Sequence, residues 1–341
     1  MEGAREAKLG KINWQQMEKP LSKVRLILGL GELLWDVLPD GPRLGGAPAN
    51  FAVMAGRLGN HVALLSRVGW DDLGKEALER LEFFPVDASL VQIDSRHETG
   101  RVTVRFEEGQ PRYTIHQPAA WDSLELSEEW VRIASRADAV CFGSLAQRGL
   151  ESRQTIQTLV AQTSPKCVRV FDVNLRKPFY TSEVIEESLE LATVVKMNDA
   201  EVPLVLELLG MPIDRDPLGR DPASGETLLL GAKMLLEEFC SLELVAVTRG
   251  DHGSLLVTRK GSHEHPGIPT PVVDTIGAGD VFTAALTHYL LLGADLATLN
   301  EAGNRWGSWI ASQCGSMPDL PEEVKAAIAL SIERGLSPGG L

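Results

Sequence analysis

The sequence predicts an α/β fold in which helices cover both faces of a mainly parallel central sheet. Short, nearly continuous apolar runs recur from residue 24 to about 320, and segments with helical spacing separate most of them. Strands that are apolar throughout are typical of parallel sheets buried on both faces. The predicted strands are 24–30, 61–68, 139–142, 168–173, 193–197 and 244–248, and the predicted helices include 50–58, 73–81, 127–136, 183–191 and 226–240.

A second, smaller sheet is predicted from a stretch that breaks this pattern. Residues 99–116 contain two alternating runs joined by the turn sequence EEGQP, which is typical of a hairpin. Together with the extended segment 33–44 it predicts a small antiparallel β flap, or lid. We expect one domain over 24–330 with the lid formed by about 33–46 and 99–118. A polar extension, 1–23, precedes the domain and a tail, 331–341, follows it.

Composition narrows the class of protein. Apolar residues make up 44% and charged residues 23% of the 341 residues, as in globular proteins. The formal net charge of −14 argues against nucleic acid or an anionic membrane as a partner. No stretch reaches the roughly 18 apolar residues that span a bilayer, and the N-terminus lacks the apolar run of a signal peptide. We therefore expect a cytoplasmic protein.

The run DTIGAGD at 274–280 carries the clearest chemical signal. It follows a short strand predicted to end at Val272-Val273 and precedes an apolar helix closed by Gly293. Small residues at a helix start let the backbone approach a ligand closely, and the free N–H groups there bind anions. Asp280 lies at this anion site. It either caps the helix or takes a proton from a hydroxyl group, and the residues alone leave these two roles about even.

This run is similar to the C-terminal signature of the ribokinase-like (pfkB-type) carbohydrate kinases, and further motifs in the family's order extend the resemblance over about residues 24–320. The resemblance implies a three-layer α/β/α fold and ATP-dependent phosphorylation of a sugar hydroxyl. It makes Asp280 the catalytic base. It assigns the backbone amides of Gly277, Ala278 and Gly279 to the charge that develops on the γ-phosphate of ATP.

Two upstream segments resemble the sugar-binding elements of the family. In the run GGAPAN (45–50), Gly45 and Gly46 would line the sugar and Asn50 would bind its hydroxyls; the alternative is a plain loop with an Asn helix cap. In the run GELLWD (31–36), Asp36 resembles the carboxylate that grips two sugar hydroxyls. Carboxylate and amide acceptors suit a neutral polyol.

The runs DVNLR (172–176) and NDAE (198–201) follow two predicted strands. The resemblance places Asn174 near the nucleotide phosphates and Arg176 near sugar and phosphate, with a plain strand-end loop as the alternative. It assigns Asn198 to the nucleotide and Glu201 to the water around Mg²⁺, an ion that keeps several waters and needs few protein ligands.

The nucleotide is expected to meet two further segments. The run TRGDHG (248–253) resembles the family's nucleotide loop, which points to Thr248, Gly250 and Gly253 as nucleotide contacts. The run AGN (302–304) is predicted to begin a helix that ends at the run GSMP (315–318), and Asn304 is the expected contact to the base or ribose. Relatives often use K⁺ beside the anion site, and carbonyl groups near Asp274, Ile276 and Ser316 are the expected ligands.

The sequence leaves the substrate open between several alternatives. The three runs GELLWD, GGAPAN and DVNLR favour a fructokinase. A 2-keto-3-deoxygluconate kinase fits Tyr113 in the flap, but Ile115 stands where an arginine is expected, and Arg105 is the substitute. A nucleoside kinase and a catalytically silent sugar-binding regulator are further alternatives, although an intact Asp280 argues against the regulator. A homodimer through the apolar outer face of the lid is also expected.

Overall fold

The computed structural model describes residues 25–39, 41–107, 110–211 and 224–333, except the side chains of 104–113. The predicted extension 1–23 and residues 334–341 of the predicted tail lie outside the described residues. The last described helix runs from Glu322 to Glu333 and so extends across residue 330.

The central sheet has eight strands in the order β14-β13-β12-β11-β10-β9-β1-β4. From β4 to β12 all neighbours pair in parallel, whereas β13 and β14 add an antiparallel edge. The strands are β1 (Leu26–Leu30), β4 (His61–Leu65), β9 (Ala139–Gly143), β10 (Val168–Asp172), β11 (Val194–Asn198), β12 (Leu244–Thr248), β13 (Ser254–Thr258) and β14 (Gly261–His265). The mainly parallel sheet predicted from the apolar runs is confirmed.

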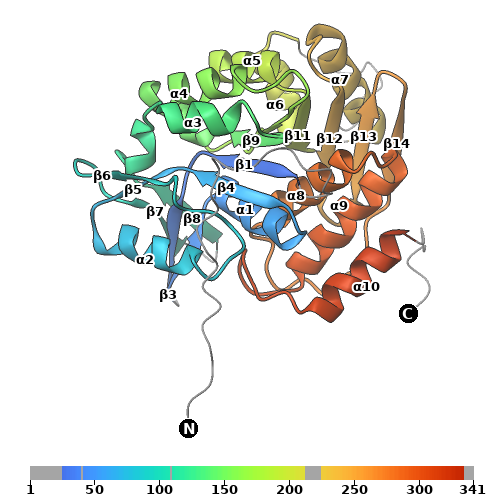
Figure 1. Ribbon diagram of the computed structural model, residues 1–341. Coiled ribbons are helices and arrows are strands. Elements are labelled where there is room, and N and C mark those ends of the chain that lie inside the picture. The colour runs from blue at the N-terminus through green and yellow to red at the C-terminus, as the bar shows by residue number, and fades with distance from the viewer. Residues whose placement is uncertain (1–24, 40, 108–109, 212–223, 334–341) are drawn as a thin grey trace.

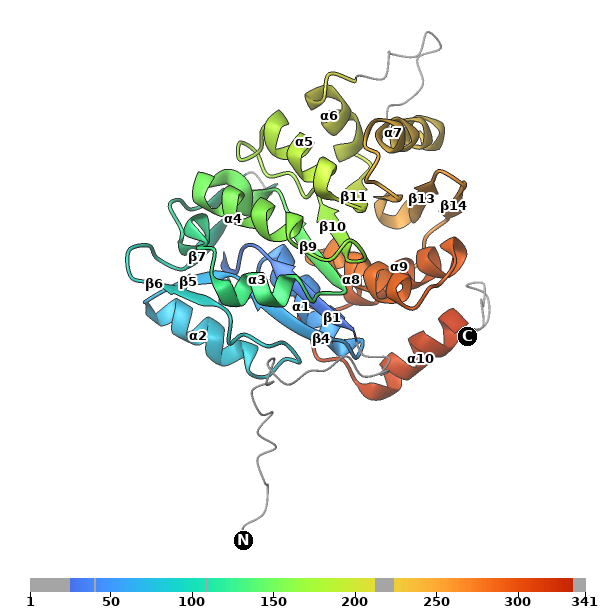
Figure 2. The same ribbon diagram turned by 45° about the horizontal axis from the view of Figure 1, so that its top comes forward.

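Helices cover both faces of this sheet (Figures 1 and 2). Side chains alternate along each strand, so Leu28 and Leu30 of β1 join one apolar core while Ile27 joins the other. The first core lies under α3 (Glu128–Ala134), α4 (Leu150–Ala161), α5 (Ser182–Leu191), α6 (Glu201–Leu208) and α7 (Gly225–Glu238). The second lies under α1 (Ala47–Arg57), α8 (Ala278–Leu291) and α9 (Leu296–Ala311), with α10 (Glu322–Glu333) packed on α9. The three-layer α/β/α prediction is confirmed.

The lid is a four-stranded sheet beside the main one, in the order β3-β2-β7-β8 (Figure 1). Its strands are β2 (Leu34–Leu38), β3 (Gly41–Gly45), β7 (Gly100–Glu107) and β8 (Gln110–Ile115). The outer pairs are antiparallel and the central pair, β2 with β7, is parallel. The buried ring of Trp35 donates from its Nε1 to the carbonyl of Leu73 at 3.0 Å, so α2 (Asp72–Leu81) covers one face of the lid. Because side chains alternate, Asp36 points to the opposite face.

Two predictions for the C-terminal third are wrong. Residues 266–277, all described, contain no strand; Val272 and Val273 are 62% and 64% exposed, and the amide of Val273 donates to the carbonyl of Ala311 at 2.8 Å. The helix predicted to begin at 302 begins at Leu296, where Asp295 caps it by accepting from the amide of Thr298 at 2.8 Å. It ends at Ala311, before the predicted GSMP stretch.

The short elements complete the described chain. A two-stranded sheet pairs β5 (Arg67–Gly69) with β6 (Gln92–Asp94), and short 3₁₀ turns lie at Ala120–Ser123, Leu145–Arg148 and Gly250–His252. No helix among the described residues is both long and apolar enough to cross a membrane. The carboxyl ends of β1, β10, β11 and β12 lead directly into the predicted site residues, and the crevice at such strand ends is the usual ligand site of open α/β sheets.

Candidate active site

The start of α8 has the backbone geometry that the DTIGAGD run predicts. Gly277 occupies the N-cap position with φ of 81°, a left-handed conformation that favours glycine. A Cβ at Gly277 would also lie 2.7 Å from the Cβ of Ser316. Ala278 donates its amide to the carbonyl of Thr275 at 3.2 Å, which closes the turn before the helix. The helix therefore starts with a glycine N-cap that contributes no capping side chain, and with its backbone amides at the site.

Asp280 points away from a capping position and toward α1. Its Oδ2 accepts a hydrogen bond from Nδ2 of Asn50 at 2.7 Å, across 230 residues of sequence. Asn50 is 5% exposed, and its Oδ1 has no hydrogen-bond partner among the described residues. The two residues predicted as base and sugar ligand therefore form one pair at the adjacent N-terminal ends of α1 and α8.

The surroundings of Asp280 shift the pKa of its carboxyl group toward neutral pH. Burial, followed by the charge of Asp172, raises the pKa of Asp280 to about 6, against the lowering effects of Asn50, Lys196 and Arg176. A carboxyl group with this pKa is mostly ionised at pH 7 and still accepts a proton readily. The site therefore holds a carboxylate suited to general base catalysis.

The lid contributes Asp36, which lies opposite Arg43 in the β2–β3 ladder. Burial raises the pKa of Asp36 to about 6, while Arg176 and Arg43 lower it. A Cβ at Gly45 would lie 2.7 Å from Oδ2 of Asp36, and one at Gly46, where φ is 108°, would collide with the carbonyl oxygen of Glu32. The backbone contact and positive φ therefore require glycine at Gly46, and Gly45 lies directly against the Asp36 carboxylate. The structure brings these predicted sugar ligands together.

Glu32 is a further carboxyl group of the site that the sequence analysis gave no role. It is 3% exposed, and its Oε2 has no hydrogen-bond partner among the described residues. Burial raises the pKa of Glu32 to about 7, with a smaller raising effect from Asp280 and a lowering one from Arg176. The signal that could have identified it was an acidic residue two positions after the apolar strand 24–30, because carboxyl groups near a buried strand end are seldom buried without a partner.

A second missed group is the network of Asp172, Lys196 and Thr283 beneath the start of α8. Asp172 accepts from Nζ of Lys196 at 3.1 Å and from Oγ1 of Thr283 at 2.8 Å. Thr283 also bonds to the carbonyl of Gly279 at 2.9 Å. A Cβ at Gly279 would lie 2.7 Å from the Lys196 ammonium group, so a buried positive charge lies beside the predicted anion site.

The loops after β10 and β11 are tied together by Glu201. Its Oε1 accepts from the amide of Leu175 at 2.7 Å and its Oε2 from the amide of Asn198 at 2.8 Å. Asn198 returns a bond, because its Oδ1 accepts from the amide of Glu201 at 2.9 Å. Asn174, in the loop after β10, has φ of 40°. Arg176, in the same loop, is exposed, and its charge lowers the pKa values of Glu32, Asp36 and Asp280.

The loop after β12 lies beside these loops. Thr248 accepts at its carbonyl from the amide of Asp199 at 2.9 Å, and its Oγ1 donates to the carbonyl of Met197 at 3.3 Å. Gly250 and Gly253 have φ of 57° and 78°, and a Cβ at Gly253 would collide with the carbonyl of His265. Gly253 therefore lets this loop pack against the backbone that follows β14, while Gly250 provides the positive φ of the turn.

Comparison with known proteins identifies the family of the chain. A family model described as pfkB family carbohydrate kinase matches residues 41–323. The chain belongs to the pfkB family of carbohydrate kinases. A protein of Pyrococcus horikoshii named as a sugar kinase is 30% identical over 298 residues, which cover 82% of this chain and 87% of the relative. A fructokinase of Salmonella typhimurium is 29% identical over 311 residues, which cover 86% and 95%.

Solved structures agree with this assignment. The crystal structure of an uncharacterized sugar kinase from Pyrococcus horikoshii in complex with ATP has a TM-score of 0.73 and 28% sequence identity, and the match covers 90% of this chain and 99% of that one. The family, the ribokinase-like fold and the class of enzyme predicted from the sequence are confirmed. The roles of single residues stay predictions.

Asn304 is the residue predicted to contact the base or ribose of the nucleotide. It sits in the middle of α9, is 7% exposed, and donates from Nδ2 to Oγ of Ser254 and to the carbonyl of Asn300, each at 2.7 Å. Its amide group therefore joins α9 to β13.

The three residues predicted around K⁺ come together in one loop region. Asp274 accepts at Oδ1 from the amide of Ile276 at 2.9 Å and at Oδ2 from the amide of Gly315 at 3.1 Å. Ser316, the next residue, packs against Gly277. In the flap, the side chains of Tyr113 and Arg105 lie outside the described residues, and the half-buried Ile115 packs on the apolar core under α3–α7.

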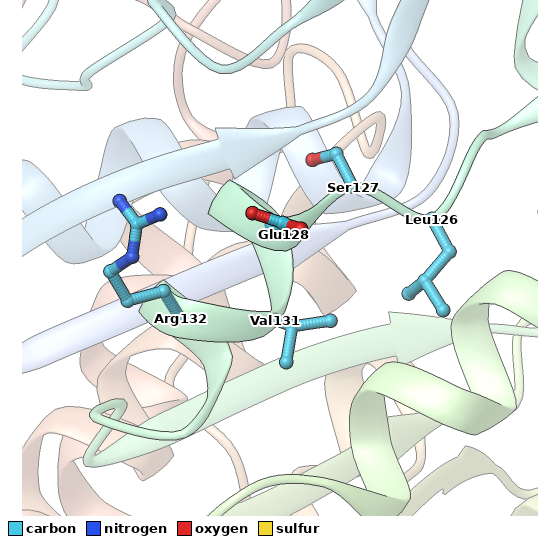
Figure 3. A pocket seen from close by; sticks show the side chains of 5 residues that line it. All are labelled: Leu126, Ser127, Glu128, Val131 and Arg132. Atoms are coloured by element: carbon cyan, nitrogen blue, oxygen red, sulfur yellow. The ribbon is translucent and has the colours of Figure 1, made fainter.

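An open pocket lies elsewhere, at the start of α3, and is shown in Figure 3. Its lining residues are Leu126, Ser127, Glu128, Val131 and Arg132. None of them is a predicted site residue, so the strand-end crevice rather than this pocket is the candidate active site.

Proposed function

We propose that this pfkB kinase transfers the γ-phosphoryl group of ATP to a hydroxyl group of a sugar, with D-fructose as the first candidate. The observation that carries the proposal is the position of Asp280. Its carboxylate lies in the first turn of α8, bonded to Asn50 at 2.7 Å and beside the left-handed Gly277. A proton acceptor and a set of backbone amides for a phosphoryl group thus lie one helical turn apart.

The sugar would be held between the lid and the N-terminal ends of α1 and α8. Asp36 and the free Oδ1 of Asn50 accept hydrogen bonds from the hydroxyl groups of the sugar. Asp280 removes the proton of the hydroxyl group that reacts. The sugar oxygen then forms a bond to the γ-phosphorus as the bond to the β-phosphate oxygen breaks, and ADP leaves. Charge on the transferred group is stabilised by the amides of Gly277, Ala278 and Gly279.

The nucleotide side fits ATP and its metal ion. Positive charge for the phosphates would come from the Lys196 ammonium group, which lies beside Gly279. Backbone groups for the phosphates would come from Gly279 and from the two loop glycines, Gly250 and Gly253. Mg²⁺ would be held mainly by ATP and water, and Glu201 would order that water, since each of its oxygens accepts one backbone amide and has lone pairs left. When bound, the ion neutralises phosphate charge.

K⁺ would lie at the loop of Asp274, Ile276 and Ser316.

A homodimer through the lid also belongs to the proposal, with β3 and β8 as the strands at the ends of the described lid sheet.

A 2-keto-3-deoxygluconate kinase is the second candidate. Arg43 and Arg176 both act on Asp36, so positive charge is present where a sugar acid would need it. The argument against a sugar acid is that neighbouring carboxyl groups offset the positive charges of Arg43 and Arg176. A site with balanced charges suits a neutral sugar. The three fructokinase-like motifs at 31–36, 45–50 and 172–176 therefore decide the order of the candidates.

A coupled assay of ADP release tests the substrate. The purified protein is offered fructose, ribose, tagatose, 2-keto-3-deoxygluconate and adenosine at several concentrations with ATP and Mg²⁺. We expect the highest kcat/KM with fructose. A higher value with the sugar acid selects the second candidate, and no turnover with any of the five contradicts the proposed reaction.

The substitution Asp280→Asn tests the role of the base. It keeps the size of the side chain and a hydrogen bond to Asn50 but cannot take a proton, so kcat should fall about 10²–10⁴-fold while calorimetry finds sugar affinity within a few-fold of the wild type. Glu98→Gln, a change at an exposed side chain outside the site, is the matched control. Near-normal turnover by Asp280→Asn would falsify the assignment.

A further inference from the structure

Arg43 connects the lid to the loop before α8. It lies on β3, and its Nη1 is 3.4 Å from Oδ2 of Asp274, a residue 231 positions away in the sequence. The side chains are 32% and 17% exposed, so the pair is partly shielded from water and its attraction is stronger than that of a surface pair. The contact is a direct bridge between the smaller sheet and the main body of the kinase.

Asp274 is the residue that shapes this loop. Its Oδ1 holds the amide of Ile276 at 2.9 Å, and the same Oδ2 that meets Arg43 holds the amide of Gly315 at 3.1 Å. Ile276 immediately precedes the left-handed Gly277, and Gly315 immediately precedes Ser316, which packs against Gly277. A change in the position of the Asp274 carboxylate would therefore move the start of α8.

Arg43 also faces Asp36. The two residues face each other in the β2–β3 ladder, and the charge of Arg43 lowers the pKa of Asp36. Arg43 thus stands between a carboxylate of the sugar side and a carboxylate that fixes the phosphate side. Its guanidinium group has five N–H donors in a planar fork, which allows one side chain to serve both.

We propose that Arg43 is a positioning residue that couples sugar binding at Asp36 to the geometry of the loop 274–277. A sugar hydroxyl that donates to Asp36 partly offsets the negative charge of Asp36. Arg43 is then attracted less to Asp36 and interacts more strongly with Asp274. The bridge then holds the start of α8 in the form that receives a phosphoryl group. By thermodynamic linkage, sugar tightens nucleotide binding and nucleotide tightens sugar binding by the same factor. This inference rests on the proposed function, because it requires a sugar at Asp36.

The test measures ADP affinity by calorimetry with and without saturating D-fructose, at constant K⁺ and Mg²⁺. In the wild type we expect fructose to tighten ADP binding by about 5-fold or more, the lower end of common coupling factors. In Arg43→Met the factor should fall below about 2-fold, while ADP affinity without sugar stays near that of the wild type. Arg43→Lys, which keeps the charge but loses the fork, should recover part of the coupling.

The matched control is Arg101→Met. Arg101 lies on β7 of the same lid sheet, but it pairs with the nearby Glu98 at 2.5 Å, and its side chain is 40% exposed. This variant should keep the full coupling factor. A double variant, Arg43→Met with Asp274→Asn, should lose no more coupling than Asp274→Asn alone, because both changes remove the same bridge.

Two results would overturn the proposal. One is a wild type in which fructose leaves ADP affinity unchanged. The other is an Arg43→Met protein that binds both ligands more weakly with the same coupling factor, as expected if Arg43 only stabilises the fold. Wild-type turnover of fructose is measured first. If another sugar of the screen is the substrate, that sugar replaces fructose in the titration, so failure of the substrate assignment is distinguished from failure of the coupling.

Discussion

The two sides of the active-site crevice differ in how completely the protein pairs its own polar groups. On the strand-loop side, formed by residues 172–201, Glu201 accepts two backbone amides and Asp172 accepts from both Lys196 and Thr283. These groups hold one another in place. Each buried charge there has a partner, as buried charges generally do.

On the lid side, formed by residues 32–50 together with Asp280, the pairing is incomplete. Oε2 of Glu32 and Oδ1 of Asn50 are buried without a hydrogen-bond partner among the described residues. Burial also raises the pKa values of Glu32, Asp36 and Asp280. Polar groups that a protein leaves unpaired are disproportionately functional. This difference supports the proposal that a ligand completes the lid side, whereas the strand-loop side is a preformed scaffold.

Lys196→Met breaks the scaffold and carries the largest expected effect. It leaves Asp172 as a buried charge without its cation, which costs about 3–5 kcal/mol of unfolding free energy. Urea unfolding measures it, with Lys75→Met, an exposed lysine on α2, as the control that should change stability by less than about 1 kcal/mol. A similarly small loss for Lys196→Met would contradict the paired scaffold.

Glu32→Gln should have the opposite effect on stability, because it should raise the unfolding free energy. The pKa of Glu32 is raised from 4.5 to about 7 in the folded protein, so the unfolded chain ionises first and the wild type loses stability as pH rises from about 4.5 to 7. The variant has no such loss. Its unfolding free energy should match that of the wild type near pH 4 and exceed it by up to about 3 kcal/mol at pH 8. A variant less stable than the wild type at pH 8 would show that Glu32 is favourably ionised.

Asp36→Asn should act on the ligand more than on the fold. The amide offers one acceptor where the carboxylate offers two, and losing a charged hydrogen bond costs about 1.5–3 kcal/mol, so KM for the sugar should rise about 10- to 100-fold with a smaller change in kcat. Steady-state kinetics with Glu98→Gln as the control measures it. An unchanged KM would remove Asp36 from the sugar site.

Much of this arrangement could be predicted from local sequence. The apolar runs place β1 and β9–β12 within one or two residues because strands buried on both faces have no competing pattern. The run DTIGAGD predicted a turn of small residues at the start of a helix, and α8 begins there with Gly277 as its N-cap. Where a motif acts through its own backbone, the sequence suffices.

The errors and omissions have physical causes. Val272 and Val273 have the residue type of a strand, but their segment bonds to the end of α9 instead of to a neighbouring strand. The true start of α9 carried a readable signal, Asp295 three residues before Thr298, which forms the cap. The position of Lys196 was also a readable signal, because a lysine inside an apolar strand needs a buried partner.

Other contacts had no local signal. Arg43 and Asp274 are 231 residues apart, and Asn50 and Asp280 are 230 apart. Only the packing of α1 against α8 and the folding of the lid over the main sheet bring these pairs together. The resemblance to the family assigned Asn50 and Asp280 to the same site without predicting their hydrogen bond, and it gave no indication of the first pair.

The pH dependence of kcat/KM for the sugar tests the central claim, that Asp280 acts as the base with a pKa set by its surroundings. Since kcat/KM reports the free enzyme and the pKa of Asp280 is about 6, activity should fall about tenfold per pH unit below pH 6, and the fall should persist in Asp36→Asn. A kcat/KM that stays constant from pH 8 down to pH 5 would contradict this account.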